Sequence, residues 1–220
     1  RLMAEYLGYQ FVDAVDWLCF EYNGKVNAEK SEAKLRELKN KYGRIVTPGF
    51  YGVMPDGEIH VFPRGGSDIT GALAAAYLGA DVYENWTDVS GILMVDPRIV
   101  KDPKTIARVT YDELRELSYM GASVLHEDTV FPVRIRDIPI NIRNTNAPDD
   151  PGTIIREKFD DELEEESERF ITGIAGKRNF SIISIYKSRI GEEKLGLLME
   201  VLEVFARYEI PVEQVPRDRK

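Results

Sequence analysis

Apolar residues follow two spacings along this chain, and the two alternate from residue 9 to residue 156. In some segments apolar residues recur every three or four positions among polar ones, which is typical of a helix with one buried face. In others, β-branched and aromatic residues form short runs bounded by Gly, Pro and Asp, which is typical of strands. Strands that alternate with helices predict an α/β sandwich.

Two amphipathic helices are predicted from this spacing. Residues 31–42 place Leu35 and Leu38 among charged residues, as expected of a short surface helix. A second helix is expected to begin near Thr110, because Glu113 follows at the spacing of a capping box and leucines follow on one face.

The predicted strands occupy the segments between helices. YQFVDAVDWLCF, residues 9–20, is expected to form one buried strand or two short ones. Three further segments combine a strand with a turn or loop: GRIVTPGFYG (43–52) runs into a glycine-rich turn, MPDGEIHVF (54–62) begins with a Pro-Asp-Gly turn, and DVYENWTDVSGI (81–92) ends in a loop. IPINIRNT (138–145) and GTII (152–155) are expected to be late strands.

The composition changes after residue 156. EKFDDELEEESE, which begins at residue 157, holds eight acidic residues, so residues 157–170 are interpreted as a solvated linker. Residues 171–220 then predict a strand-rich stretch, a helix and the start of another strand, IPVEQV. The helix carries its apolar stripe on Leu195, Leu198, Leu202 and Phe205. A β-α-β beginning cannot close a domain alone, so we expect the end of this module to be missing.

Composition narrows the classes of function. The formal net charge is −9 and the pI about 4.9, which gives no electrostatic attraction to nucleic acid or anionic membranes. No apolar run reaches the roughly 20 residues of a membrane span. The single cysteine, Cys19, cannot form an internal disulfide and lies among Trp17, Leu18 and Phe20. We therefore expect a cytoplasmic protein in which this cysteine is a buried structural thiol.

The stretch RGGSD, residues 64–68, directly precedes an alanine-rich helix that Gly79 is expected to end. Ser67 and Asp68 are suited to cap the helix, with the two glycines in the turn before it. A helix N-terminus offers unpaired N–H groups to an anion, and Arg64 could grip a carboxylate or phosphate through two hydrogen bonds. A plain strand–turn–helix connection accounts for the same residues equally well.

A second loop suited to anions follows about twenty residues later. Thr87 and Asp88 are expected at the carboxyl end of a strand, where open α/β sheets bind ligands. Asp96 and Pro97 then shape a turn that leaves Arg98 free to meet phosphate oxygens. Each feature alone is usually only a turn. Together with RGGSD they favour a phosphotransferase that acts on a carboxylate, since such chemistry relies on positioning and charge neutralisation.

Five segments in this order resemble the motifs of aspartokinases: VTPGFYG, RGGSDITGALAAAYLGAD, WTDVSGI with DPRIV, LSYMGASVLHEDTV and NIRNTNAPDDPGTII. The resemblance covers essentially the whole chain. It implies a three-layer αβα amino-acid kinase sandwich over residues 1–156 and, over 171–220, a ferredoxin-like βαβ ACT regulatory module, incomplete here. It also implies phosphorylation of the side-chain carboxylate of L-aspartate by ATP with Mg²⁺, the first step of lysine, threonine and methionine biosynthesis.

The resemblance also implies roles for individual residues. Substrate aspartate is held by Arg64 and Ser67 with Gly65 and Gly66, and Asp68 positions a catalytic lysine and the phosphates. The residues implied to bind ATP are Thr87, Asp88, Arg98, Ser123 and Val124. A feedback amino acid, lysine or threonine, is expected between paired modules at Lys194, Leu195, Gly196 and Leu197, so a homo-oligomer is implied. No side chain is assigned as a metal ligand.

One departure keeps an alternative open. The glycine-rich segment that supplies the phosphate-binding lysine in aspartokinases is absent, and we expect residue 1 to lie inside the kinase domain. A catalytically silent regulatory protein that binds an amino acid without turning it over fits the same residues. A kinase for another amino-acid carboxylate is disfavoured by the ACT-like tail.

Overall fold

The structure is a computed structural model that describes residues 1–63, 65–119, 125, 127–159, 171–176, 181–184, 194–212 and 215. The side chains of residues 119, 127–129, 194 and 195 lie outside the described part. The chain divides into two compact units, residues 1–178 and residues 179–220.

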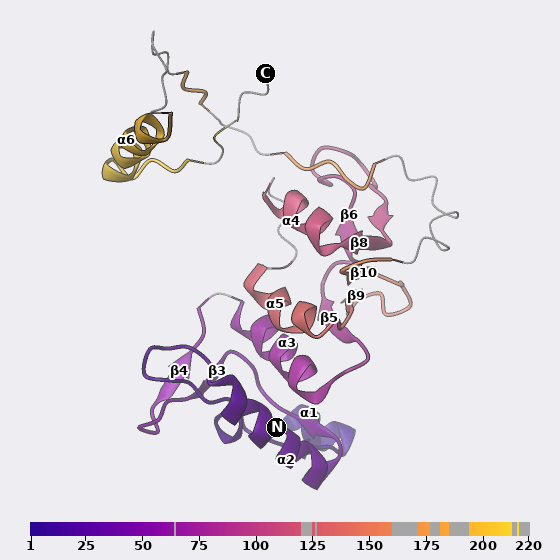
Figure 1. Ribbon diagram of the computed structural model, residues 1–220. Coiled ribbons are helices and arrows are strands. Elements are labelled where there is room, and N and C mark those ends of the chain that lie inside the picture. Colours follow the sequence, from indigo (N-terminus) through magenta and orange to yellow (C-terminus); the bar gives the residue numbers. More distant parts are fainter. Residues whose placement is uncertain are drawn as a thin grey trace. The chain divides into compact units, whose positions relative to one another are not determined.

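The first unit begins with two small β pairs and a long helix (Figure 1). Strand β1 pairs in parallel with β2, and β3 forms an antiparallel hairpin with β4. The elements, in chain order, are α1 (Leu2–Leu7), β1 (Gln10–Phe11), the 3₁₀ helix η1 (Ala14–Asp16), α2 (Ala28–Tyr42), β2 (Ile45–Val46), β3 (Tyr51–Val53) and β4 (Ile59–Val61). Helix α2 confirms the predicted amphipathic helix and begins three residues earlier, after the N-cap Asn27.

Residues 9–20 do not form the expected long strand. Strand β1 has two residues, and the side chain of Asp13 then caps η1 in a capping box with Asp16. Cys19 and its neighbours return to the sheet only through an isolated bridge to Val53. Because the Asp13 carboxylate caps η1, the backbone turns at this point. The apolar residues that follow are buried, but they belong to a loop and not to a strand. The predicted burial of Cys19 is confirmed.

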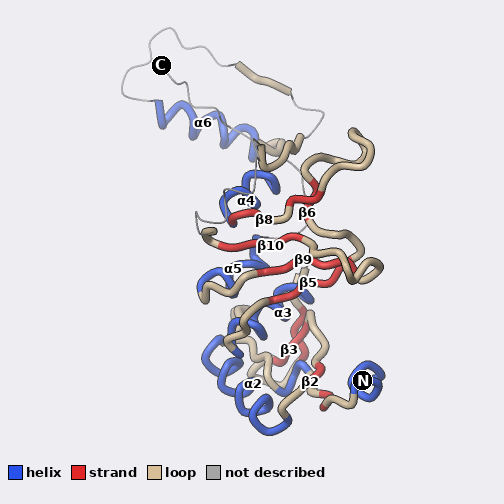
Figure 2. The backbone as a smooth tube through the Cα atoms, turned by 90° about the vertical axis from the view of Figure 1, so that its right-hand side faces the viewer, coloured by secondary structure: helices blue, strands red, loops and turns tan. Residues whose placement is uncertain are grey.

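A four-stranded mixed sheet forms the centre of the first unit (Figure 2). The strand order is β5-β9-β10-β8, with β5 parallel to β9, β9 antiparallel to β10, and β10 parallel to β8. A separate antiparallel pair joins β6 to β7. The bounds are β5 (Tyr83–Thr87), β6 (Ile92–Leu93), β7 (Thr105–Ile106), β8 (Arg108–Thr110), β9 (Ile140–Asn144) and β10 (Thr153–Arg156).

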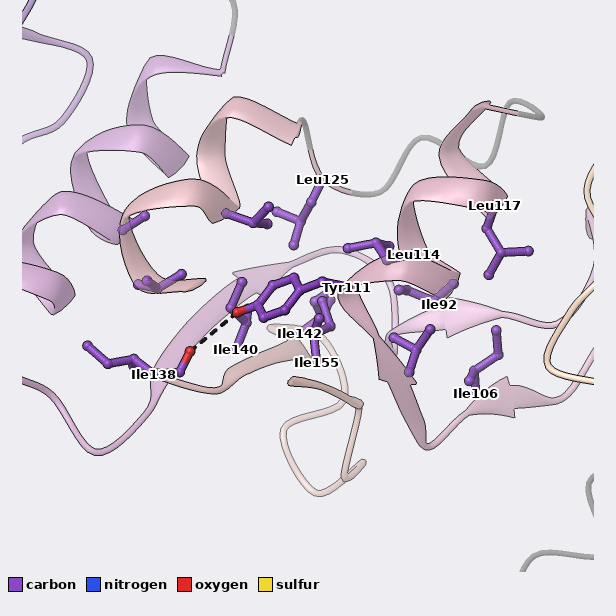
Figure 3. Close-up of a cluster of buried hydrophobic side chains, with 14 residues drawn as sticks. Ile92, Ile106, Tyr111, Leu114, Leu117, Leu125, Ile138, Ile140, Ile142 and Ile155 are labelled. Atoms are coloured by element: carbon purple, nitrogen blue, oxygen red, sulfur yellow. Dashed lines mark hydrogen bonds between the residues drawn. The ribbon is translucent and has the colours of Figure 1, made fainter. Parts of the chain in front are cut away.

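Three helices cover one face of this sheet: α3 (Gly66–Leu78), α4 (Tyr111–Tyr119) and α5 (Glu127–Ile135). Figure 3 shows the apolar cluster of these helices and the strands, in which Leu117 of α4 lies above Ile92 and Ile106. The capping box predicted at the start of α4 is present, since the backbone N–H of Thr110 donates to Glu113 at 2.8 Å. A mixed sheet under helices confirms the predicted α/β class.

The second unit contains helix α6 (Lys194–Arg207), which confirms the predicted helix. Its neighbours differ from expectation. Residues 181–184 and 210–212 form no strand, and the rest of the two predicted strand segments lies mostly outside the described residues. A strand needs the edge of another strand to satisfy its N–H and C=O groups, and the described residues of this unit offer none.

Residues 171–176 belong with the first unit, although the sequence places them in the C-terminal module. The backbone N–H of Ile174 donates to the carbonyl of Met94 at 2.7 Å, and the hydroxyl of Thr172 donates to Glu113 at 2.5 Å.

Within the described residues, no helix is long and apolar enough to cross a membrane.

Two buried tyrosines give a stability prediction with opposite signs at neutral pH. Among the residues that the structure describes, the hydroxyl of Tyr77 has no hydrogen-bond partner, whereas that of Tyr111 donates to the carbonyl of Ile138 at 3.4 Å. Because removing an unpaired buried hydroxyl removes a desolvation cost, Tyr77→Phe should raise the free energy of unfolding by about 1 kcal/mol. Tyr111→Phe should lower it by about the same amount, since it leaves the carbonyl without this donor.

Alkaline pH adds a second readout. Burial raises the pKa of both Tyr77 and Tyr111 to about 12. In the unfolded chain a phenol ionises near pH 10, so each tyrosine should cost stability as the pH rises from about 10 through 12. Urea unfolding at pH 7 and pH 10.5 should show a smaller alkaline loss in each variant than in the parent. An alkaline loss unchanged in both variants would contradict the burial of these phenols.

Candidate functional site

Helix α3 presents an N-terminus without a side-chain cap. The residue before the helix is Gly65, whose φ of 85° lies in the left-handed region that favours glycine. The helix therefore starts at Gly66, and the expectation that Ser67 or Asp68 forms the N-cap is wrong. Both residues lie in the first helical turn, and among the described residues no side-chain cap accepts a hydrogen bond from the first N–H groups. The predicted C-terminal residue Gly79 is confirmed, with φ 62°.

The loop of the motif VTPGFYG, to which no role was assigned from the sequence, packs against this helix start. A Cβ on Gly66 would lie 2.6 Å from Cβ of Phe62 and 3.1 Å from Cα of Phe50, so only glycine fits. The backbone N–H of Phe50 donates to the hydroxyl of Thr70 at 3.0 Å, and that hydroxyl donates to the carbonyl of Gly66 at 2.7 Å. Phe50 has a φ of 72° and a half-exposed side chain. The only local signal was the Pro48-Gly49 dipeptide before it.

Strand β5 lies antiparallel to α3 and bonds to its first turn. The side-chain amide of Asn85 donates to Oδ1 of Asp68 at 3.0 Å, and the hydroxyl of Tyr83 donates to the backbone carbonyl of Asp68 at 3.3 Å. The helix N-terminus and the carboxyl end of β5 therefore lie at the same edge of the sheet. Asn85 was not singled out from the sequence.

The carboxyl end of β5 is fixed by the neighbouring strand β9. Thr87 pairs with Asn144, and both the N–H and the hydroxyl of Thr145 donate to the carbonyl of Thr87, at 2.8 and 2.9 Å. The hydroxyl of Thr87 in turn donates to Asp88 at 3.3 Å. The predicted location of Thr87 and Asp88 at a strand end is confirmed, and the backbone there is held from two sides.

The turn after Asp88 is tied to the loop that follows β9. The hydroxyl of Ser90 accepts a hydrogen bond from Asn144 at 2.9 Å and donates one to Asp150 at 2.5 Å. Asn144 and Asp150 belong to the motif at 141–155, to which no role was assigned from the sequence. The two loops at this edge thus form one connected unit.

Arg98 was expected to be free to meet phosphate oxygens, but the structure shows it paired with a neighbouring carboxylate. Its guanidinium forms an ion pair with Asp96 at 2.6 Å, although the arginine side chain remains 87% exposed. The hydrogen bonds that its guanidinium donates to the Asp96 carboxylate raise the pKa of Arg98 further above its usual range. In the described part of the chain, no hydrogen bond or ion pair joins Arg98 to residues 65–68 or 87–88.

The remaining predicted site residues lie either outside the described residues or in the second unit. Arg64, Ser123 and Val124 lie outside the described residues. Lys194, Leu195, Gly196 and Leu197 form the first turn of α6, in the second unit, and a Cβ on Gly196 would contact nothing within 4 Å. Among the described residues, no group of three or more His, Cys, Asp and Glu side chains is placed to hold a metal ion.

A hollow of about 870 Å³ lies at the opposite edge of the sheet, beside the starts of β5 and β9. Its charged lining is mixed: Asp81, Asp137 and Glu157 with Arg134, Arg156 and Lys158. Arg134 is already paired with Glu157 at 2.7 Å. None of the predicted site residues lines it, so the uncapped helix and the strand ends are the better candidate site.

Comparison with known proteins places these observations in a family. The sequence signature of the amino acid kinase family matches residues 1–144. Aspartokinase 3 of Bacillus subtilis is 37% identical over 224 aligned residues, which cover 98% of this chain and 48% of that protein. The chain thus spans about half the length of the curated relative that it matches.

Solved structures of aspartate kinases are also similar to this chain. The crystal structure of Clostridium acetobutylicum aspartate kinase matches with a TM-score of 0.87 and 46% identity, over 99% of this chain and 49% of that one. E. coli aspartokinase III in complex with aspartate and ADP matches with a TM-score of 0.69 and 26% identity, over 98% and 48%. The same enzyme in complex with lysine and aspartate matches with a TM-score of 0.60 and 32% identity, over 69% and 35%.

These matches cover the segment that holds α3, β5 and β9, and they agree with the α/β architecture of the first unit. The chain belongs to the amino acid kinase family.

Proposed function

We propose that this protein is an aspartokinase, which transfers the γ-phosphoryl group of ATP to the side-chain carboxylate of L-aspartate and forms 4-phospho-L-aspartate. One observation carries the proposal: the uncapped N-terminus of α3 and the carboxyl ends of β5 and β9 lie at one edge of the sheet. This edge offers N–H groups for an anion next to a strand-end loop for a nucleotide. The identity to aspartokinases over nearly the whole chain supports aspartate as the acceptor.

The aspartate side of the site is assigned to residues 64–68. Arg64 is suited to hold a carboxylate through two parallel hydrogen bonds, and Ser67 is exposed in the first turn of α3. The N–H groups of Gly65 and Gly66 allow close approach because neither residue carries a Cβ. Asp68 orients the groups around the transferred phosphoryl.

The nucleotide side is assigned to Thr87, Asp88 and Arg98, with Ser123 and Val124 as further contacts. The pair Arg98–Asp96 would open, so that the guanidinium meets phosphate oxygens. Asp68 and Asp88 are carboxylates at this edge, and such groups can hold the water ligands of Mg²⁺. When bound, Mg²⁺ neutralises phosphate charge.

In the proposed reaction an oxygen of the aspartate side chain forms a bond to the γ-phosphorus. The bond from that phosphorus to the β–γ bridging oxygen breaks, and ADP leaves. Aspartate needs no general base, because its side chain is already ionised at neutral pH. The protein contributes position and positive potential from Arg64, Arg98 and the α3 N-terminus.

Regulation by lysine or threonine is proposed at residues 194–197, in an ACT module within the second unit, residues 179–220. The first turn of α6 offers backbone N–H groups to the α-carboxylate of an amino acid. The E. coli enzyme in complex with lysine supports an amino-acid effector. Pairing of such modules would make the protein a homo-oligomer, and we propose a cytoplasmic location for it.

The direct test is ATP turnover by the full-length protein with L-aspartate, with L-glutamate as the control acceptor. We expect ADP formation that depends on aspartate and Mg²⁺, and inhibition by lysine or threonine. Aspartate binding without turnover would contradict the proposal and support a silent regulatory protein.

Arg64→Ala tests the carboxylate clamp. Loss of a charge-assisted bidentate contact should lower kcat/KM for aspartate by about 30- to 1,000-fold. Arg64→Lys should not restore it, since an ammonium lacks the planar fork. Steady-state kinetics at saturating ATP provide the measurement, and an Arg64→Lys variant with parental kinetics would refute the clamp.

Asp88→Ala tests the nucleotide loop. ATP should bind at least about 10-fold more weakly, the loss expected for one hydrogen bond to a charged group, while aspartate affinity stays near the parental value. Calorimetric titration with each ligand measures both affinities. Asp56→Ala, in the exposed turn between β3 and β4, is the matched control and should change neither. Unchanged ATP affinity in Asp88→Ala would mean that Asp88 serves only its own turn.

A further inference from the structure

In the part of the chain that the structure describes, only one of the two carboxylate oxygens of Asp68 is held by a hydrogen bond. Oδ1 accepts a hydrogen bond from the side-chain amide of Asn85 at 3.0 Å. Within the described residues, no hydrogen bond or ion pair reaches Oδ2. Asp68 and Asn85 are both half-buried, between α3 and the helix-covered face of the sheet. A hydrogen bond from a neutral amide to a carboxylate in such a place is charge-assisted and directional.

Asn85 is itself held in place by Tyr83. Its amide also donates to the Tyr83 hydroxyl at 3.2 Å, and that hydroxyl donates to the backbone carbonyl of Asp68 at 3.3 Å. The hydroxyl can do both because it accepts and donates at once. Burial raises the pKa of Tyr83, so the hydroxyl keeps its proton. Asp68, Tyr83 and Asn85 thus form a closed ring of hydrogen bonds.

The sequence of α3 makes room for this ring. Gly71 interrupts an otherwise alanine- and leucine-rich helix, although glycine is among the poorest helix formers. A Cβ at this position would lie 2.6 Å from the Tyr83 hydroxyl and 3.0 Å from its ring. The helix therefore has a poor helix former at the position where the side chain of Tyr83 packs against it.

We infer that Asn85 is a positioning residue, which fixes the Asp68 carboxylate through Oδ1 so that Oδ2 alone is available to the reacting groups. This inference rests on the proposed function, in which Asp68 orients the groups around the phosphoryl. Asn85 touches neither substrate. It acts through Asp68, and Tyr83 and Gly71 support it.

The alternative is that the ring only ties α3 to β5. A purely structural tie would lower stability when broken, and any loss of activity would then be independent of Asp68. A positioning role predicts a loss in kcat that vanishes when Asp68 no longer carries a charge. The two roles are therefore separable by combining variants.

The experiment uses Asn85→Leu, which keeps the side-chain volume and removes the donor. In the full-length protein kcat should fall at least about 10-fold, as expected on loss of a hydrogen bond to a charged group, with both KM values within about twofold of the parent. Asn85→Asp keeps the shape but provides no donor when ionised, and should lose at least as much. Glu84→Gln, on the opposite face of the same strand, should retain parental kcat.

The decisive comparison is made in the Asp68→Asn background, where adding Asn85→Leu should change kcat less than about twofold. Multiplicative losses in the double variant would overturn the inference. So would parental kcat in both Asn85 variants.

A readout independent of activity keeps this inference distinct from the proposed function. In crystal structures, the Asp68 side chain should adopt one conformer in the parent and several in Asn85→Leu. A single parental conformer in the variant would overturn the inference. Absence of turnover in the parent would instead overturn the proposed function and leave this structural comparison valid.

Discussion

The close approach of helix α3 to strand β5 is the constraint on which the candidate site depends. Gly71 lets the Tyr83 hydroxyl reach beneath the helix, and two residues further along β5 the amide of Asn85 meets Asp68. These two contacts fix the helix antiparallel to the strand. The N-terminus of α3 therefore comes to the edge at which β5 and β9 end. A helix displaced by one turn would carry its free N–H groups away from the loop at Thr87 and Asp88.

Local signals in the sequence were sufficient to predict many of the helices and strands of the first unit. The capping box of Thr110 and Glu113 marks the start of α4, and Gly79 adopts the left-handed φ that ends α3. Both depend on residues no more than a few positions apart. The short apolar runs at 138–145 and 152–155 correctly predicted β9 and β10, because a buried strand carries its own signal in β-branched residues. The α/β class followed from their alternation.

What the sequence could not provide were contacts between distant segments. Asn85 gains its role only because Asp68 faces it from another element, 17 residues earlier. Two other predictions failed for local reasons. Arg98 was expected to be free, but Asp96 two residues away offers it a carboxylate at 2.6 Å. The N-cap prediction failed because Gly65 adopts a positive φ and starts the helix before Ser67. The described parts of the two predicted C-terminal strand segments, residues 181–184 and 210–212, have no described partner edge.

The central claim is that aspartate and nucleotide meet at one edge of the sheet, between α3 and β5. The most direct test is a crystal structure of the full-length protein with L-aspartate and a non-hydrolysable ATP analogue. We predict a carboxylate of aspartate at the N–H groups of Gly65–Asp68 and the analogue against Thr87 and Asp88, with its γ-phosphate directed at the aspartate side chain. Either ligand bound instead in the hollow beside Asp81 and Arg156, at the opposite edge, would contradict the account.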